Sequence, residues 1–573
     1  MKGLSWLIEI TVMNEDIRVE EETTYLELSK KYKKMFDGPI MGVRVGNTLK
    51  ELTSKVSDGE EIVFVDPSRP EGMSIYMRTV CMVMLKAVRD VLGNEAEVVI
   101  ENSIKKNFYC EIHKGETVVD EELVTKIKKA MDDIIERDMP IVREKFTHEE
   151  AVKKLAECGH YDKVKLYKYR NDTIVNLYCL DGYYDYLYGY MAPSTGCVYL
   201  YDIVPFERGF LLCVPSAKNI KVLPEIEHFE KITGVFMEQM DWSRLMEVKS
   251  VSDLNDTIVN GKFGELVRIN EALHEKKTAS IADMIYQRRD SVKLVLIAGP
   301  SSSGKTSFAN RLGIQLRVLG IKPHVISMDD YFINRDETPL DEFGNRDYEN
   351  INCIDIELFN KDINDLIAGK TVELPSYNFI SGTREYKGNF VRLKKDEIMI
   401  IEGIHGLNDQ LTPSIKKENK FKIFISAMTQ LNVDNHKFIS TSDSRLLRRM
   451  VRDNLSRGND AAATIAAWPY VTRGDSAEDT INRWPSVRRG EDKWIFPYQE
   501  NADAMFNSAT IYEIAVLKQY AEPLLYKIDE SMPEYITAKR LIKFLAYFLG
   551  APAEPIPNNS LIREFVGGSV FHV

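Results

Sequence analysis

A glycine-rich loop that ends in a lysine and a threonine is the clearest group of residues that could do chemistry. The stretch "GPSSSGKT" covers residues 299–306 and fits the pattern G-x-x-x-x-G-K-S/T. Small residues leave backbone N–H groups free to hold phosphate oxygens. Lys305 offers a positive charge to the outer phosphates, and the Thr306 hydroxyl can hold Mg²⁺. The predicted ATP-binding residues are Gly299, Pro300, Ser301, Ser302, Ser303, Gly304, Lys305, Thr306 and Ser307.

The segments on either side of the loop fit this chemistry. "KLVLIA" (293–298) is typical of a buried strand, and "TSFANRLGIQLRVLG" (306–320) has the apolar spacing of a helix. The start of that helix adds partial positive charge where the phosphates would lie. A glycine-rich turn that matches the pattern by chance is the alternative, and the strand and helix argue against it.

Two carboxylates follow the next apolar strand, "HVISMDDYF" (324–332). Because the carboxyl ends of parallel strands line the ligand crevice, Asp329 or Asp330 should face the terminal phosphate. There a carboxylate can accept the proton of an attacking hydroxyl. An aspartate that only caps the strand is the alternative. The sequence therefore predicts a catalytic base, for which we favour Asp329.

A third carboxylate, Glu402, ends the buried strand "DEIMIIE" (396–402). An acidic oxygen at this edge of the sheet is placed to complete a Mg²⁺ shell, directly or through water. Backbone donors that satisfy the carboxylate are the alternative. We expect Thr306 and Glu402 to hold the metal ion.

Arginines gather in the predicted helix "DSRLLRRMVRDNLSRG" (443–458). Spacings of three and four put Arg445, Arg448, Arg449 and Arg452 on one face. On a lid that closes over the site, such a face would neutralise charge on the transferring phosphoryl group. A basic face that solvent covers is the alternative. We expect Arg445 and Arg448 to act in catalysis together with Lys305.

Composition limits the class of protein. The 573 residues carry a formal net charge of −12, and 44% of them are hydrophobic. This acidic balance argues against a protein that coats nucleic acid with its whole surface. The seven cysteines form no C-x-x-C pair, which favours reduced thiols in the cytoplasm. We see no signal peptide and no apolar run of the roughly 18 residues that a membrane span needs.

The chain reads as a multidomain protein of α+β and α/β units. Residues 1–66 mix short strands and a helix, residues 73–220 alternate helical and strand patterns, and residues 221–290 form a helical connector after a linker at 67–72. Strands alternate with helices over 291–510, which predicts a parallel sheet with flanking helices. Residues 511–573 are a helical extension.

Residues 290–510 resemble the uridine kinase and phosphoribulokinase family of P-loop kinases. The resemblance rests, in order, on "GPSSSGKT", "MDDYF", "YENINCIDIE", "PSYNFISGTRE", "IIEGIHGL" and "RLLRRMVRDNLSRG". It implies ATP, Mg²⁺ and phosphoryl transfer to a sugar hydroxyl, typically of a nucleoside. By motif, Asp329 matches the catalytic base and Glu402 the Mg²⁺-associated acid. The acceptor-binding residues that it implies are Phe332, Glu349, Tyr377, Phe379, Arg384 and Arg457.

The chain departs from the family at one pocket position. Pyrimidine kinases have "H-x-R" where this chain has "G-T-R", so Gly382 replaces the histidine that helps to read the pyrimidine ring. This departure argues against uridine, so a different nucleoside or a phosphorylated sugar, as in phosphoribulokinase, is open beside the nucleoside that the family implies.

The front of the chain resembles threonyl-tRNA synthetase. Residues 1–66 look like its TGS domain, and residues 73–220 look like its editing domain, through "KAVRDVLG", "NFYCEI" and "DYLYGYM". Where the family has two helix histidines this chain has Arg78 and Met82, so the resemblance implies a degenerate domain without editing chemistry. An RNA- or ribosome-binding P-loop protein is a rival function, and a protein partner or a homo-oligomer stays open.

Overall fold

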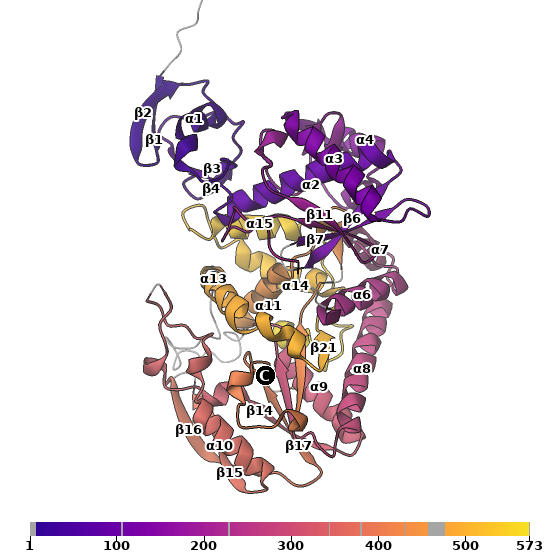
Figure 1. Ribbon diagram of the computed structural model, residues 1–573, viewed down its shortest axis with the longest axis vertical. Coiled ribbons are helices and arrows are strands. Elements are labelled where there is room, and N and C mark those ends of the chain that lie inside the picture. Colours follow the sequence, from indigo (N-terminus) through magenta and orange to yellow (C-terminus); the bar gives the residue numbers. More distant parts are fainter. Residues whose placement is uncertain are drawn as a thin grey trace, which may run out of the picture.

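The computed structural model describes residues 7–104, 107–226, 230–342, 344–378, 381–429, 431–455 and 476–571. Figure 1 shows an elongated molecule, with the N-terminal elements at one end and a parallel sheet at the other. That sheet has five strands in the order β14-β17-β13-β18-β21, and every neighbouring pair is parallel. Its strands are β13 (Leu294–Ala298), β14 (Lys322–Ser327), β17 (Glu397–Glu402), β18 (Lys420–Ser426) and β21 (Ala504–Asn507).

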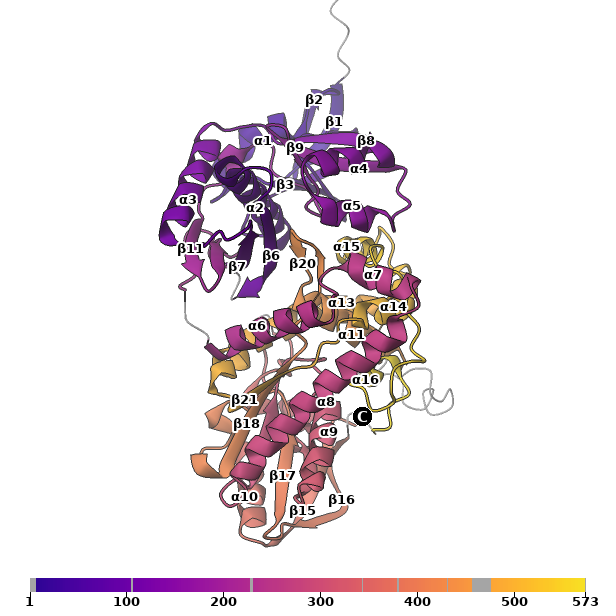
Figure 2. The ribbon, with the colours of Figure 1, turned by 90° about the vertical axis from the view of Figure 1, so that its right-hand side faces the viewer.

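Apolar sequence explains why the middle strands lie inside. Every residue of β13, β17 and β18 is buried, as expected for a parallel sheet that helices cover on both faces. Residues of β13 alternate between two cores, with Val295 and Ile297 on one face and Leu294 and Leu296 on the other. Helices α8 (Phe263–Gln287) and α9 (Lys305–Val318) cover the first face, and α10 (Ile356–Ile367) covers the second (Figure 2).

An antiparallel hairpin and short helical turns surround the carboxyl edge of this sheet. The hairpin consists of β15 (Thr371–Asn378) and β16 (Thr383–Arg392). The turns are η3 (Met328–Tyr331), η4 (Arg335–Glu337) and η5 (Ile351–Cys353). Contacts between β15 and η3 join the hairpin to the end of β14. These segments are the ones to which the sequence assigned the acceptor.

A helical layer packs beside the sheet around one large apolar core. This core includes side chains of α7, α8, α11, α13, α14, α15 and α16. The bounds of the helices not yet given are α7 (Val251–Val259), α11 (Thr441–Leu455), α13 (Ala477–Trp494), α14 (Glu513–Leu525), α15 (Tyr535–Leu545) and α16 (Arg563–Val566). Helix α6 (Glu230–Leu245) instead packs near β21.

Two smaller units precede the parallel sheet. The first has a sheet in the order β2-β1-β5-β3-β4 with its own core, and it contains β1 (Leu7–Val12), β2 (Glu15–Glu20), α1 (Tyr25–Tyr32), β3 (Gly42–Val45), β4 (Thr48–Lys50) and β5 (Glu61–Val65). The linker expected at 67–72 is shorter than predicted, because Pro70 already begins α2 (Pro70–Leu92). Proline suits the first turn of a helix, where its missing N–H is not needed.

The second unit packs α2 against two antiparallel sheets, ordered β11-β12-β7-β6 and β10-β9-β8. Its other elements are β6 (Glu97–Ile104), β7 (Asn107–His113), α3 (Glu121–Glu136), β8 (Val142–Thr147), α4 (His148–Glu157), α5 (Tyr161–Tyr167), β9 (Ile174–Leu180), β10 (Tyr183–Asp185), β11 (Asp202–Phe206) and β12 (Gly209–Cys213). Arg78 and Met82 lie in α2, and the Arg78 Nε donates to the Tyr190 carbonyl at 2.9 Å.

A small hairpin from the sheet region reaches the second unit. Strands β19 (Asn432–Asp434) and β20 (Lys437–Phe438) lie between β18 and α11, and the Ile100 N–H donates to the Asn435 carbonyl at 2.7 Å. Lys163 of α5 is fully buried there between two carboxylates, 2.9 Å from Asp185 and 3.0 Å from Asp434. This contact ties the second unit to the start of α11.

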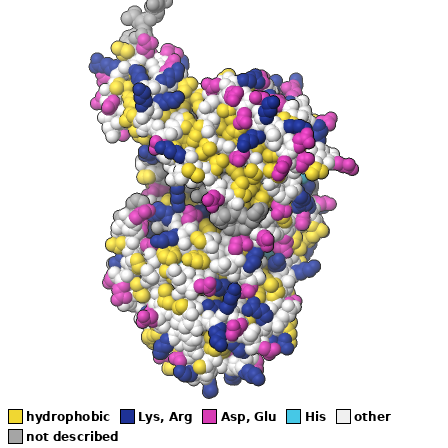
Figure 3. Space-filling model, in the orientation of Figure 1, with side chains coloured by type: hydrophobic (Ala, Val, Ile, Leu, Met, Phe, Trp, Pro, Cys, Tyr) yellow, Lys and Arg dark blue, Asp and Glu magenta, His cyan; other side chains and the backbone are white. Residues whose placement is uncertain are grey.

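The visible surface carries charges of both signs side by side, with apolar side chains gathered on the second unit (Figure 3). Among the residues drawn in colour, that face carries no single basic field. Among the helices that the structure describes, none combines the length and apolar character needed to cross a bilayer.

Candidate active site

The phosphate loop joins β13 to α9, as its sequence context predicted. Gly304 caps α9 with φ +80°, a left-handed conformation that glycine adopts without strain. Gly299 is required for a different reason, because a Cβ at that position would lie 1.9 Å from the Ile425 carbonyl oxygen of β18. The Lys305 amine folds back onto the loop and donates to the Gly299 carbonyl at 3.1 Å.

Thr306 and Glu402 meet beside the loop. The Thr306 hydroxyl donates to the Glu402 carboxylate at 3.0 Å, because Glu402 ends β17, the neighbour of β13 in the sheet. Burial raises the pKa of Glu402 to about 7, while the Lys305 charge lowers it and the Asp329 charge raises it further. A hydroxyl oxygen and a buried carboxylate whose negative charge is not fully balanced by Lys305 are oxygen ligands that suit Mg²⁺.

The two aspartates after β14 have different surroundings. The Asp330 carboxylate accepts a hydrogen bond from the Tyr377 N–H at 3.1 Å, so it is engaged with β15. The charge of Asp329 raises the pKa of both Glu402 and Glu349. Ser327 pairs with Glu402 in the parallel register, so Asp329 follows the same edge of the sheet by two residues. The role of Asp329 as the catalytic base stays a prediction.

Three of the residues assigned to the acceptor, namely Phe332, Tyr377 and Arg384, lie at the β15–β16 hairpin. The Phe332 and Tyr377 rings stand edge to face, with centroids 5.6 Å apart. Arg384 donates to Asp355, the residue that caps α10, at 2.9 Å. Two further assigned residues, Phe379 and Arg457, lie outside the described residues.

Glu349 is half-buried, with one carboxyl oxygen fully enclosed. Its Oε2 atom has no hydrogen-bond partner among the described residues. Burial raises the pKa of Glu349 to about 7, with a further contribution from the negative charge of Glu491, whereas Arg449 and Lys305 lower it. A carboxylate with an unused, enclosed oxygen is suited to accept hydrogen bonds from hydroxyl groups of a ligand.

Arg445 and Arg448 lie in the interior beside the phosphate loop, so they do not form the solvent-covered basic face that was the alternative to a lid. Both side chains are 0% exposed. The Arg445 guanidinium donates to the Ser301 carbonyl at 3.1 Å, and Arg448 donates to the Ser302 carbonyl at 3.4 Å. The leucines of α11 pack into the helical core, so the face that carries Arg445 and Arg448 is turned to the phosphate loop and to acidic side chains of other helices. These arginines therefore hold the loop from behind.

Sequence reasoning missed three acidic residues that contact this region. Glu491 of α13 forms an ion pair with Arg445 and also accepts from the Ser301 N–H at 3.1 Å, and Glu513 pairs with Arg448. Glu564 of α16 accepts from the Ser307 hydroxyl at 2.8 Å. Each acid lies far from its partner along the chain, and no local pattern marks it.

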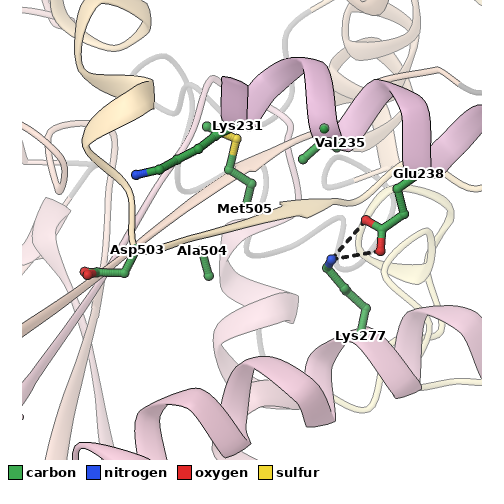
Figure 4. A pocket seen from close by; sticks show the side chains of 8 residues that line it. Lys231, Val235, Glu238, Lys277, Asp503, Ala504 and Met505 are labelled. Atoms are coloured by element: carbon green, nitrogen blue, oxygen red, sulfur yellow. Dashed lines mark hydrogen bonds and ion pairs between the residues drawn. The ribbon is translucent and has the colours of Figure 1, made fainter. Parts of the chain in front are cut away.

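A surface hollow lies elsewhere, between α6, α8 and β21 (Figure 4). Its lining residues are Lys231, Gly234, Val235, Glu238, Lys277, Asp503, Ala504 and Met505. Lys277 and Glu238 face each other across it as an ion pair at 2.9 Å. None of the predicted site residues lines this hollow, so it does not belong to the candidate site.

Known proteins resemble both halves of the chain. The family described as "Phosphoribulokinase / Uridine kinase family" matches residues 294–472. A uridine kinase of Macrococcus caseolyticus is 30% identical over 172 residues, which are 30% of this chain and 74% of that protein. A solved structure described as a possible uridine kinase from Bacillus stearothermophilus is 27% identical and covers 26% of this chain and 79% of its own, with a TM-score of 0.22.

The N-terminal part has a separate relative. A threonine–tRNA ligase of Syntrophotalea carbinolica is 24% identical over 156 residues, or 27% of this chain. This chain spans about a quarter of the ligase, namely 24% of its length. The resemblances predicted from the motifs are thus confirmed: a segment similar to threonine–tRNA ligase precedes a kinase domain, and the chain belongs to the phosphoribulokinase/uridine kinase family.

Proposed function

We propose that this protein transfers the γ-phosphoryl group of ATP to a hydroxyl group of a nucleoside-like acceptor. The observation that carries the proposal is the meeting of three chemical groups at one edge of the sheet. Thr306 touches Glu402 at 3.0 Å beside the phosphate loop, and the charge of Asp329 acts on the same carboxylate. A metal site, a phosphate cradle and a base are the parts that phosphoryl transfer needs.

The chain's own residues divide the work. The loop amides and Lys305 bind the phosphates, and Thr306 with Glu402 would hold Mg²⁺, which when bound neutralises charge on the phosphate oxygens. Asp329 accepts the proton of the acceptor hydroxyl as that oxygen attacks phosphorus. Arg445 and Arg448 act through the loop, because their guanidinium groups donate hydrogen bonds to its carbonyl oxygens. Their role is to keep the loop amides in position.

The acceptor would lie between the loop and the β15–β16 hairpin. The Phe332 and Tyr377 rings offer an apolar wall on which a planar base can pack. Glu349 is placed to accept hydrogen bonds from ribose hydroxyl groups, since its unused oxygen is buried near Lys305 and Asp329. These residues support a nucleoside-like acceptor over a protein or nucleic-acid substrate.

The test is an acceptor panel with the purified full chain, Mg²⁺ and ATP. Uridine, cytidine, adenosine, inosine, guanosine and ribulose 5-phosphate are offered singly, and the products are identified by mass. We expect a monophosphate from at least one nucleoside, and loss of that product in Lys305→Met. ATP hydrolysis without any phosphorylated acceptor would contradict the proposal.

A further inference from the structure

The Arg335 side chain fills the space in which a side chain at position 382 would lie, because residue 382 is a glycine. Gly382 lies in the turn between β15 and β16 with φ +72°. A Cβ built on Gly382 would lie 2.8 Å from the Arg335 Cβ, 2.9 Å from its Nε and 3.1 Å from its Cζ. Any side chain at position 382 would therefore run into the stem and head of Arg335.

The backbone fixes this arrangement. The Arg335 N–H donates to the Gly382 carbonyl at 2.8 Å, and the Gly382 N–H donates to the Asn378 carbonyl at 2.8 Å. Arg335 begins the turn η4, three residues after Phe332, so one segment supplies both an aromatic wall and the arginine. A glycine at 382 and an arginine at 335 thus form a matched pair, in which the small residue makes room for the large one.

The charge of Arg335 acts on one ring of the aromatic wall. Burial raises the pKa of Tyr377, and the positive charge of Arg335 is the largest effect that opposes it. The Tyr377 ring is itself 5.6 Å from the Phe332 ring, measured between centroids. A planar ligand packed on this wall would present its edge toward Arg335.

The chemistry of the guanidinium restricts what that edge can be. Arginine is a planar fork that only donates hydrogen bonds, and it matches two acceptor atoms placed side by side. A 6-oxopurine has such a pair in O6 and N7. The uracil O4 stands next to an N–H donor, and adenine carries an amino group in place of O6. Cytosine also has two neighbouring acceptors, O2 and N3, but its O2 lies beside the nitrogen that carries the ribose. A phosphate or carboxylate on a sugar also offers two acceptors, but it makes no use of an aromatic wall.

We propose that Arg335 reads the base of the acceptor and that this base is a 6-oxopurine, as in inosine or guanosine. The inference rests on the proposed kinase function, because it names the acceptor class of the same site. It also explains why the chain departs from the pyrimidine kinases at Gly382: the histidine is replaced by a donor fork that comes from another segment.

The experiment compares kcat and KM for inosine, guanosine, adenosine, uridine, cytidine and ribulose 5-phosphate. The variants are Arg335→Met, Arg335→Lys and, as a matched control, Arg392→Met. Arg392 is on the same hairpin but donates to the Gly369 carbonyl at 2.8 Å, far along the strands from the turn.

We expect inosine or guanosine to have the highest kcat/KM in the wild type. Arg335→Met should raise the KM for that nucleoside by about tenfold or more, the value of one bidentate pair, with little change in kcat. Arg335→Lys should recover part of the loss, because one donor remains. Adenosine and uridine should respond little, and Arg392→Met should resemble the wild type.

Each contrary result has a distinct meaning. Preference for uridine, or an equal rise in KM for all acceptors in Arg335→Met, overturns the role of Arg335 and leaves the kinase function intact. Preference for cytidine overturns the 6-oxopurine assignment, because cytosine offers O2 and N3. Preference for ribulose 5-phosphate identifies the two acceptor atoms as those of a phosphate and overturns the 6-oxopurine assignment. Absence of product from every acceptor overturns both this inference and the proposed function.

Discussion

Replacing Arg445 with methionine should destabilise the kinase domain strongly, because it would leave Glu491 buried without its main partner. Both side chains are 0% exposed, and the Arg445 Nη2 lies 2.8 Å from the Glu491 Oε2. Burial alone would raise the pKa of Glu491, yet the Arg445 charge holds it below the ordinary value of 4.5. The stabilisation is therefore present at neutral pH and is lost only as the pH falls below that value.

Removing one partner of a buried pair costs about 3–5 kcal/mol. Here the lower end applies, since Arg488 also lies 2.9 Å from the Glu491 carboxylate with its own side chain 35% exposed. We expect Arg445→Met to lose about 3 kcal/mol of unfolding free energy. The double variant Arg445→Met/Glu491→Leu should recover about 2 kcal/mol of that loss, because no uncompensated charge remains.

Urea unfolding, followed by tryptophan fluorescence, measures these differences. Arg346→Met is the control, because its pair with the almost fully exposed Asp336 should contribute less than about 1 kcal/mol. Phosphoryl transfer should stay low in the double variant even though stability returns, since the Ser301 N–H and carbonyl would both lose their partners. A loss below about 1 kcal/mol in Arg445→Met, or a double variant no more stable than the single one, would refute this reasoning.

Three further predictions concern neighbouring groups. The KM for the acceptor should rise about tenfold from pH 8 to pH 6, because Glu349 has a pKa of about 7 and binds hydroxyl groups best when it is ionised. The variant Glu349→Gln should flatten this pH profile. Glu564→Gln should tighten ATP binding by about tenfold in calorimetry, because the Glu564 carboxylate, which accepts from the Ser307 hydroxyl, repels the phosphates. An unchanged affinity would contradict this prediction. Lys163→Met should speed hydrogen exchange across residues 432–438, because two buried aspartates would lose their shared cation, and unchanged exchange would show that the hairpin is held otherwise.

Short sequence patterns predicted those parts of the site whose positions depend on neighbouring residues in the chain. The phosphate loop is recognisable because its glycines serve tight backbone positions, as Gly299 and Gly304 do against β18 and at the start of α9. The strand that precedes Asp329 and the strand that ends in Glu402 could be placed side by side, because the carboxyl ends of parallel strands meet at one edge of a sheet. The roles of these residues stay predictions, but their positions follow from short stretches of sequence.

Contacts between residues far apart in the chain could not be predicted from short sequence patterns. A basic face on a helix fits a closing lid, a face covered by solvent and a buried partner of acids, and Leu446, Leu447, Arg445 and Arg448 of α11 are all buried. The acids that decide the matter, Glu491 and Glu513, come from α13 and α14. The pairing of Gly382 with Arg335 was equally hidden, because it joins two segments that no motif connects.

The most direct test of the central claim is the single-turnover rate of γ-phosphoryl transfer in Asp329→Asn and Asp330→Asn. These neighbours differ in surroundings, and an asparagine at position 330 can still accept the Tyr377 N–H that Asp330 accepts at 3.1 Å. If Asp329 is the base, its variant should lose about 10²–10⁴-fold in rate, whereas the Asp330 variant should lose less than about tenfold. Equal losses in the two variants, or a rate near the wild type in Asp329→Asn, would contradict the account.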